Sequence, residues 1–213
     1  RPMSGCALAA PTPAQAARLL CTTAEQVHAA VEGRSAPAVD LQDLHECTVD
    51  GCFVSLKRGG QLRSCCGIVA GPHPLPSALV RAAWRAACDD PRFPPISVTE
   101  LDALALELHL LFDWQTCSDP AHARAAAVHV GRHGLVMRMG ARAGLLLPAV
   151  AVEHGWDAIA FLRQTCAKAG LPTDAWQQET CQLECFQAHH LHCALQEALQ
   201  RRDRPTTPDG QHR

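Results

Sequence analysis

Residues 51–67, which read GCFVSLKRGGQLRSCCG, constrain the fold of this chain more than any other segment. A mainly apolar run at residues 52–56 precedes the glycine pair 59–60, and a second predicted strand follows it, a pattern typical of a β-hairpin with a tight turn. Because strand side chains alternate in direction, Arg63 and Cys65 are predicted on one face and Cys66 on the other. A guanidinium beside a thiol favours the nucleophilic thiolate. The segment therefore indicates either a reactive Cys65 or, as is common for strand cysteines, a thiol packed in the core.

Composition excludes several classes of protein. The 213 residues carry a net charge of −2, so the chain lacks the basic excess of a nucleic-acid-binding protein. No apolar run reaches the roughly 18 residues that a membrane span requires. The apolar run at residues 6–10 is too short for a signal peptide, and we expect a cytoplasmic protein. The start at Arg1 suggests a fragment or a processed chain.

Twelve cysteines allow disulfides, metal ligands or simple core packing. Without an export signal, we expect free thiols, and several lie within predicted helices. No pair has the spacing of a zinc knuckle. His190 and His192 would share one face of a strand, where two imidazoles suit zinc or copper. We nevertheless expect no native metal and no cofactor, because such residues also accumulate by chance near a chain terminus.

Hydrophobic periodicity predicts an α/β (α+β) protein. Helices are expected from Thr12-Pro13 to Gly33, around Leu75–Ala83 before Asp90, as a short turn after Ser97, and from Asp157 to Gly170; strands are expected at Leu104–Phe112 and Cys181–Leu191, with strand, turn and strand over Val128–Met139. We predict a single domain with two lobes over residues 1–200 and a disordered tail at 201–213.

Five blocks together resemble the AMMECR family, called AmmeMemoRadiSam system protein A in bacteria and archaea. The blocks are Gly51–Leu56 with Leu62–Gly67, similar to GCFVTLK and LRGCIG; Asp90–Ile96, similar to DPRFPPL; Gly131–Leu135, similar to GxHGL; and Leu147–Asp157, similar to LPQVAxExGWD. They occur in the family's order over roughly residues 12–192. Ser64 stands where the family has glycine, and Cys66 where it has isoleucine.

The resemblance implies a mainly antiparallel sheet with surrounding helices, plus a smaller second lobe. It also implies a cleft between the lobes that gathers the motif residues. By name and gene neighbourhood, the family is linked to a Memo-type protein and a radical-SAM protein. These two proteins are the partners that the resemblance implies, and a peptide or protein substrate is possible.

The residue types at these motifs predict a site. Cys65 is the candidate nucleophile, Arg63 its electrostatic activator and His133 a general base, with Glu153 orienting His133 or contacting substrate. His133 also has a structural interpretation as a turn histidine. Glu153 and Trp156 are expected to open the next helix, where Glu153 could equally be a solvated glutamate. Four further residues are predicted to bind substrate: Asp90, Arg92, Phe93 and Trp156. The alternative for Asp90 and Arg92 is a local ion pair, and the alternative for Phe93 and Trp156 is simple packing.

Two classes of function follow from this site. The first is a cysteine-dependent enzyme of the transferase or modification type, which acts with the Memo-type and radical-SAM partners. The second is a non-catalytic adaptor that binds partner proteins through the same cleft. Only the enzyme requires an activated thiol with a base within reach. The chain has no Gly-rich phosphate loop, no GxSxG elbow and no zinc-deaminase signature.

Overall fold

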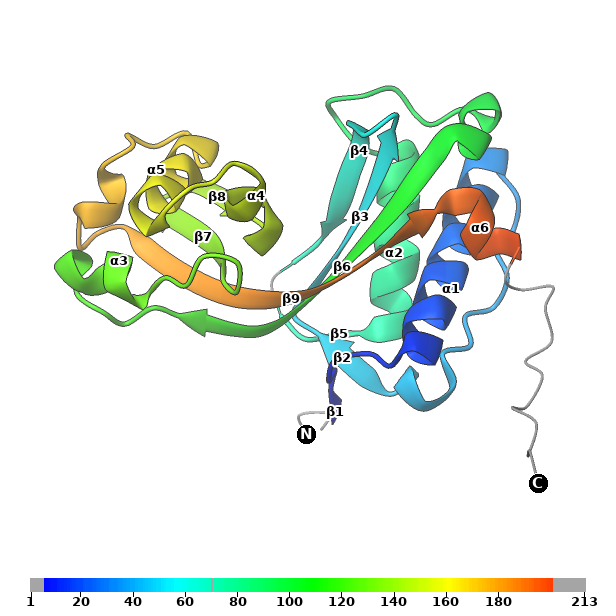
Figure 1. The fold of residues 1–213 in the computed structure, drawn as a ribbon, viewed down its shortest axis with the longest axis horizontal. Coiled ribbons are helices and arrows are strands. Elements are labelled where there is room, and N and C mark those ends of the chain that lie inside the picture. Colours follow the sequence, from blue (N-terminus) through cyan, green and yellow to red (C-terminus); the bar gives the residue numbers. More distant parts are fainter. Residues whose placement is uncertain (1–5, 70, 201–213) are drawn as a thin grey trace. The chain divides into compact units, whose positions relative to one another are not determined.

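A computed structural model of the chain describes residues 6–69 and 71–200 (Figure 1). The structure is a mixed α/β fold, which confirms the predicted class. Its strands are β1 (Cys6–Ala7), β2 (Cys47–Val49), β3 (Gly51–Arg58), β4 (Gln61–Ile68), β5 (His73–Pro74), β6 (Leu104–Thr116), β7 (Gly134–Met139), β8 (Arg142–Leu146) and β9 (Gln182–Ala194). Its α-helices are α1 (Pro13–Glu32), α2 (Leu75–Cys88), α3 (Arg124–Ala127), α4 (Pro148–Glu153), α5 (Ala158–Lys168) and α6 (Leu195–Gln200), with short 3-10 turns at Gln42–Leu44, Val98–Ala103, Ala121–Ala123 and Ala175–Gln177.

The strands form two sheets. The larger has six strands in the order β4-β3-β6-β9-β7-β8, and the smaller has three in the order β1-β2-β5. The chain divides into two compact units, one made of residues 1–110 with 189–213 and the other of residues 111–188. Strands β6 and β9 each contribute residues to both units. The predicted single domain over residues 1–200 stays a prediction, and the predicted disordered tail lies outside the described residues.

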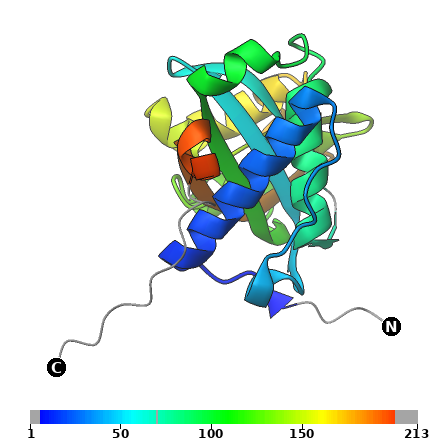
Figure 2. The same ribbon diagram turned by 90° about the vertical axis from the view of Figure 1, so that its right-hand side faces the viewer.

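Unit 1, made of residues 1–110 and 189–213, contains the predicted hairpin. Strands β3 and β4 pair antiparallel, with Ser55 opposite Cys65 and a shift in register after Leu56. Helices α1 and α2 lie side by side over the sheet, and α2 contacts both β3 and β4 (Figure 2). Thr12 and Gln15 form a capping box at the start of α1, and the left-handed Gly33 ends it as predicted. The core of unit 1 lies between these helices and the sheet.

Unit 2, made of residues 111–188, has its own apolar core around Phe161 and Leu162 of α5. Asp157 caps α5 through its side chain, as the sequence predicted. Strand β7 pairs antiparallel with β8 on one side and with β9 on the other. Helix α5 packs on β7 and β8.

Two local predictions in unit 2 are wrong. Residues 128–130 form no strand: Gly131 has a left-handed φ of 85°, and the His133 N–H bonds to the His129 carbonyl at 2.9 Å, so the chain turns before β7. Glu153 and Trp156 do not open a helix. Glu153 ends α4, and Trp156 follows the left-handed Gly155 before α5 begins.

None of the helices in residues 6–69 and 71–200 combines the length and apolar character required to cross a membrane.

Candidate functional site

Cys65 lies in the second half of β4, where the hairpin sets its surroundings. Its thiol is half-buried, whereas the neighbouring Cys66 is only 7% exposed and belongs to the core. The two side chains therefore occupy opposite faces, as the strand period predicts. Directly across the hairpin, the buried Ser55 donates a hydrogen bond from its hydroxyl to the Cys65 Sγ at 3.0 Å. The Ser55 side chain on the neighbouring strand therefore contacts the Cys65 sulfur directly.

Asp90 fastens the loop after α2 to this part of β4. The residue is 7% exposed, and its carboxylate accepts the Cys65 backbone N–H at 2.8 Å. It also accepts hydrogen bonds from the backbone N–H and the guanidinium of Arg92, at 2.8 to 3.0 Å. Burial opposes ionisation of Asp90, but Arg92 and these backbone donors hold its pKa well below the usual range. Asp90 is therefore an anchored carboxylate.

The guanidinium of Arg92 contacts the backbone of Cys65. Its Nη2 donates to the Cys65 carbonyl oxygen at 2.9 Å and to the Asp90 carboxylate at 2.8 Å. The guanidinium also lies over the Phe93 ring, 5.5 Å from its centroid. The structure thus brings Cys65, Asp90, Arg92 and Phe93 together within unit 1.

Ser64, where the family resemblance implies glycine, joins this region to α2. Its side chain is 1% exposed and donates a hydrogen bond to the Ala86 carbonyl at 2.6 Å. Its hydroxyl also lies 3.3 Å from the Asp90 carboxylate. Ser64 therefore forms a polar link between β4 and the last turns of α2.

Arg63 is engaged with a neighbouring loop. Its guanidinium binds both carboxylate oxygens of Glu100, at 2.7 and 3.1 Å, and the carbonyls of Pro94 and Pro95 at 3.0 and 3.2 Å. Arg63, with help from Ser97, lowers the pKa of Glu100 to about 2. The contacts show Arg63 holding residues 94–100 against β4, and its action on Cys65 stays a prediction.

His133 lines a pocket within unit 2. The pocket has a volume of about 220 Å³ and is lined by Asp113, Gln115, His129, Arg132, His133, Cys185, Phe186 and Gln187. The His133 Nδ1 accepts the His129 backbone N–H at 3.3 Å, which leaves the proton of a neutral ring on Nε2. Burial, and then the nearby His129 and Arg132, lower the pKa of His133. A neutral imidazole of this kind is available as a base near neutral pH.

Glu153 and Trp156 lie elsewhere in unit 2. Trp156 stacks on His154, with ring centroids 4.6 Å apart. The Glu153 side chain is exposed and forms no hydrogen bond or ion pair with the described residues. The His133 ring instead contacts His129, both its backbone N–H and its ring. The roles predicted for these residues, and their convergence with Cys65, remain predictions.

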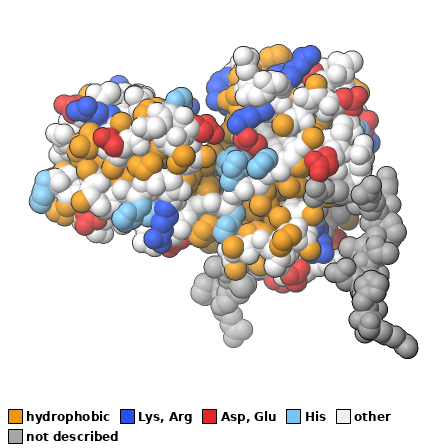
Figure 3. Space-filling model, in the orientation of Figure 1, with side chains coloured by type: hydrophobic (Ala, Val, Ile, Leu, Met, Phe, Trp, Pro, Cys, Tyr) orange, Lys and Arg blue, Asp and Glu red, His pale blue; other side chains and the backbone are white. Residues whose placement is uncertain are grey.

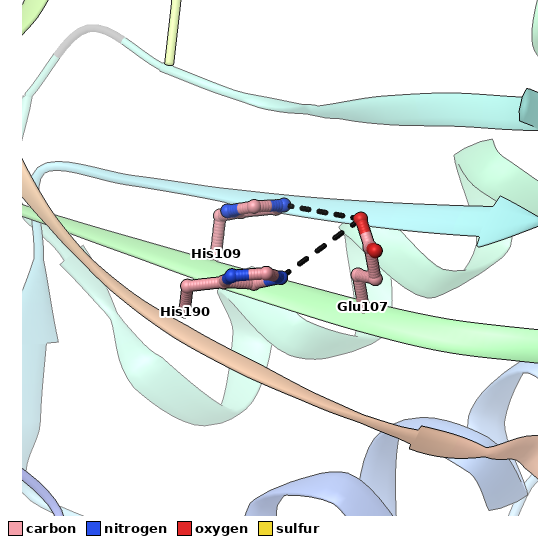
Figure 4. A group of neighbouring side chains, drawn as sticks. All are labelled: Glu107, His109 and His190. Carbon is pink, nitrogen blue, oxygen red and sulfur yellow. Dashed lines mark ion pairs between the residues drawn. The ribbon is translucent and has the colours of Figure 1, made fainter. Parts of the chain in front are cut away.

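Sequence reasoning missed two features of unit 1. The first is Ser55, which was not predicted as a site residue although strand pairing across a turn at residues 59–60 places it close to Cys65. The second is a cluster of Glu107, His109 and His190, for which the alternation of Glu107 and His109 along a strand was the available signal. Figure 4 shows the two imidazole rings stacked and turned toward the carboxylate.

Within this cluster, Glu107 interacts with both histidines and with Lys57. The Oε2 of Glu107 lies 3.8 Å from the His109 Nε2 and 3.9 Å from the His190 Nε2, and the Lys57 Nζ lies 2.7 Å from Oε1. His109 contributes most to lowering the pKa of Glu107 to about 2; burial opposes this shift, and Lys57 adds to it. Glu107 is therefore a carboxylate at neutral pH.

Known proteins match the chain over most of its length. Residues 20–191 match the AMMECR1 family. A protein of Thermococcus onnurineus is 43% identical over 143 residues, covering 65% of this chain and 70% of the relative. Protein PH0010 of Pyrococcus horikoshii is 42% identical over 143 residues, covering 65% of this chain and 69% of the relative.

A solved structure extends the match to the fold. The crystal structure of the uncharacterised protein PH0010 from Pyrococcus horikoshii superposes with a TM-score of 0.78 at 34% identity. The match covers 84% of this chain and 91% of that one. Sequence and fold therefore agree, and the chain belongs to the AMMECR1 family.

Proposed function

We propose that this AMMECR1-family protein is a cysteine-dependent enzyme of the transferase or modification type, with Cys65 as its nucleophile. One observation carries the proposal: the half-buried Cys65 Sγ accepts a hydrogen bond from the buried Ser55 hydroxyl at 3.0 Å. A thiolate is the form that attacks an electrophilic carbon or sulfur, and the Ser55 hydroxyl is placed to donate a hydrogen bond to that sulfur. The proposed reaction transfers the thiol proton to a general base, the role predicted for His133.

Contacts to the Cys65 backbone support this role because they hold the residue in place. Its backbone N–H is held by Asp90 and its carbonyl by Arg92, so both ends of the residue are fixed. A nucleophile on a fixed backbone loses little freedom when substrate binds. The proposal extends to a peptide or protein substrate and to the Memo-type and radical-SAM partners that the family resemblance implies.

Alkylation tests the proposal directly. We expect iodoacetamide near neutral pH to label Cys65 faster than any other cysteine. Exposure alone does not predict this result, because Cys117 and Cys185 are also half-buried. Burial, however, raises the pKa of Cys117, and it raises that of Cys185 to about 12. Peptide mapping by mass spectrometry after timed labelling measures each rate.

Two variants sharpen this experiment. Ser55→Ala removes the donor to sulfur and should slow labelling of Cys65, whereas Ser77→Ala, an exposed serine on α2, should not. Equal rates in wild type and Ser55→Ala, or preferential labelling of another cysteine, would overturn the proposal.

His133→Gln examines the predicted base in an activity assay and should lower the turnover of any Cys65-dependent reaction.

An adaptor that binds its partner through α2, in place of the predicted cleft, has one supporting observation. Val80 and Trp84 lie one helical turn apart and remain 38% and 52% exposed. An exposed tryptophan is a common anchor of protein interfaces. If Trp84→Ser abolishes binding to a purified Memo-type protein while Cys65→Ser changes neither binding nor any activity, the adaptor replaces the enzyme as the better interpretation.

A further inference from the structure

Two neighbouring strands place three potential metal ligands together within unit 1. Glu107 and His109 are two residues apart on β6 and therefore share a face of the strand. His190 comes from β9, which lies beside β6 in the sheet. One ligand atom from each side chain lies within 4.8 Å of the other two. Figure 3 shows histidines gathered on one face of unit 1, amid hydrophobic side chains.

The spacing of these atoms is close to what a zinc-type ion requires. Bonds from zinc to nitrogen or oxygen are about 2.0–2.1 Å, so ligand atoms of a tetrahedral site lie about 3.3 Å apart. The Glu107 Oε2 is 3.8 Å from the His109 Nε2 and 3.9 Å from the His190 Nε2. These distances exceed the 3.2 Å upper range of an ordinary N–H···O hydrogen bond, and they exceed the tetrahedral value by only about half an ångström.

The side chains around the cluster are arranged as they are around metal ligands. The Lys57 Nζ binds the Glu107 Oε1 at 2.7 Å, which leaves Oε2 turned toward both imidazoles. Ligating carboxylates are usually held by such an outer partner. The His109 side chain is 5% exposed and firmly packed, whereas the His190 side chain is 37% exposed and leaves an entry path.

From this arrangement we propose that Glu107, His109 and His190 bind one divalent transition-metal ion of the zinc class, through Glu107 Oε2 and the Nε2 atoms of both histidines. Two imidazoles and one carboxylate are a zinc ligand set that leaves a fourth position for water or substrate. The rings now stack with centroids 4.4 Å apart and planes within 6°. Binding tilts them toward a shared ion. The proposed site departs from the sequence-based expectation of no metal, and its ligands differ from the His190 and His192 pair.

Cobalt(II) titration of the whole chain tests the site, because the spectrum identifies the ligands. Thiolate ligands give an intense near-ultraviolet charge-transfer band, whereas nitrogen and oxygen ligands give only the weaker visible bands. This distinction is needed in a protein with twelve cysteines. We expect one equivalent of cobalt to bind with visible bands alone, and one equivalent of zinc to displace it.

Matched variants connect the signal to the three residues. Because loss of an outer partner alone typically costs 10–100-fold in metal affinity, Glu107→Gln and His190→Gln should each weaken binding by roughly tenfold or more. His45→Gln, an exposed histidine outside the cluster, should bind as wild type does. Circular dichroism melts verify that each variant folds. Unchanged affinity in a folded Glu107→Gln, a thiolate-type band, or absence of binding by wild type would overturn the proposal.

Discussion

At the scale of single residues, the region around Cys65 depends on one buried carboxylate. Both oxygens of Asp90 accept hydrogen bonds, from the Cys65 backbone and from Arg92. The adjacent Asp89 is different, because its side chain is 54% exposed and pairs with Arg85 at 3.3 Å. Neighbouring aspartates thus differ sharply in what they contribute to the fold.

Asp90→Asn should therefore destabilise the protein, while Asp89→Asn should not. An asparagine presents an NH₂ group to donors that now meet a carboxylate oxygen, and an unsatisfied buried group costs roughly 1–3 kcal/mol. The exposed Asp89 pair is expected to contribute within about 0.5 kcal/mol. Urea unfolding of the two variants measures the difference. Equal stability of both would show that the Asp90 contacts contribute little to folding.

Cys66 allows a second residue-scale prediction. The thiol is 7% exposed, and burial raises its pKa, so it behaves as a core side chain. Cys66→Ile introduces the residue that the family resemblance places there, and we expect a change in unfolding free energy of less than about 1.5 kcal/mol. Iodoacetamide labelling of Cys65 should stay fast in this variant. A loss of labelling would place Cys66 in the reactive site.

At the scale of elements, close backbone contacts determine how β7 and β9 pair. Gly134 begins β7 opposite Phe186 of β9. A Cβ added at Gly134 would lie 2.2 Å from the Phe186 ring, and that ring is fully buried. Glycine at this position therefore permits an aromatic side chain to cover the strand.

Gly134→Ala should consequently cost roughly 1–3 kcal/mol, the usual range for overpacking a core. Phe186→Leu creates space at the same place, although it loses packing of its own. Because the two positions are in contact, the double variant should be more stable than the sum of the single effects. Thermal or urea unfolding of the four proteins completes the cycle. Strict additivity would mean that the Phe186 ring moves aside at no cost.

At the scale of the whole molecule, the chain builds two separate apolar cores. One packs α1 and α2 on the sheet of unit 1, and the other surrounds α5 in unit 2. The predicted nucleophile belongs to unit 1, and the predicted base belongs to unit 2. Ion pairs with depressed carboxyl pKa values also hold parts of unit 1 together, among them Asp90 with Arg92 and Glu100 with Arg63.

Stability should therefore fall in acid. Arg63 lowers the pKa of Glu100 to about 2 in the folded protein, whereas the pKa of an unfolded glutamate is about 4.3. A depressed pKa contributes stability above the unfolded value, and that contribution is lost as the pH falls toward 2. Glu100→Gln should be less stable than wild type at pH 7, with a difference that shrinks in acid. Urea unfolding over this pH range measures it, and a constant difference would contradict the prediction.

Local rules were sufficient for the parts of the fold that depend on nearby residues. The glycine pair at 59–60, the Thr12 cap and the left-handed Gly33 act over a few positions, and the elements they predicted are confirmed. The strand period alone placed Cys65 and Cys66 on opposite faces. The prediction of a strand at residues 128–130 failed, because Gly131 turns the chain there despite the apolar residues.

The sequence by itself determined the family, the fold class, the hairpin and the identity of the candidate nucleophile. Only the tertiary structure decided which groups surround that nucleophile. Asp90 binds the Cys65 backbone although the two residues are 25 positions apart in the sequence. His190 lies near Glu107 although their strands are far apart along the chain. Such contacts depend on how helices and strands pack in three dimensions, and the period of a single strand carries no information about its neighbours in the sheet.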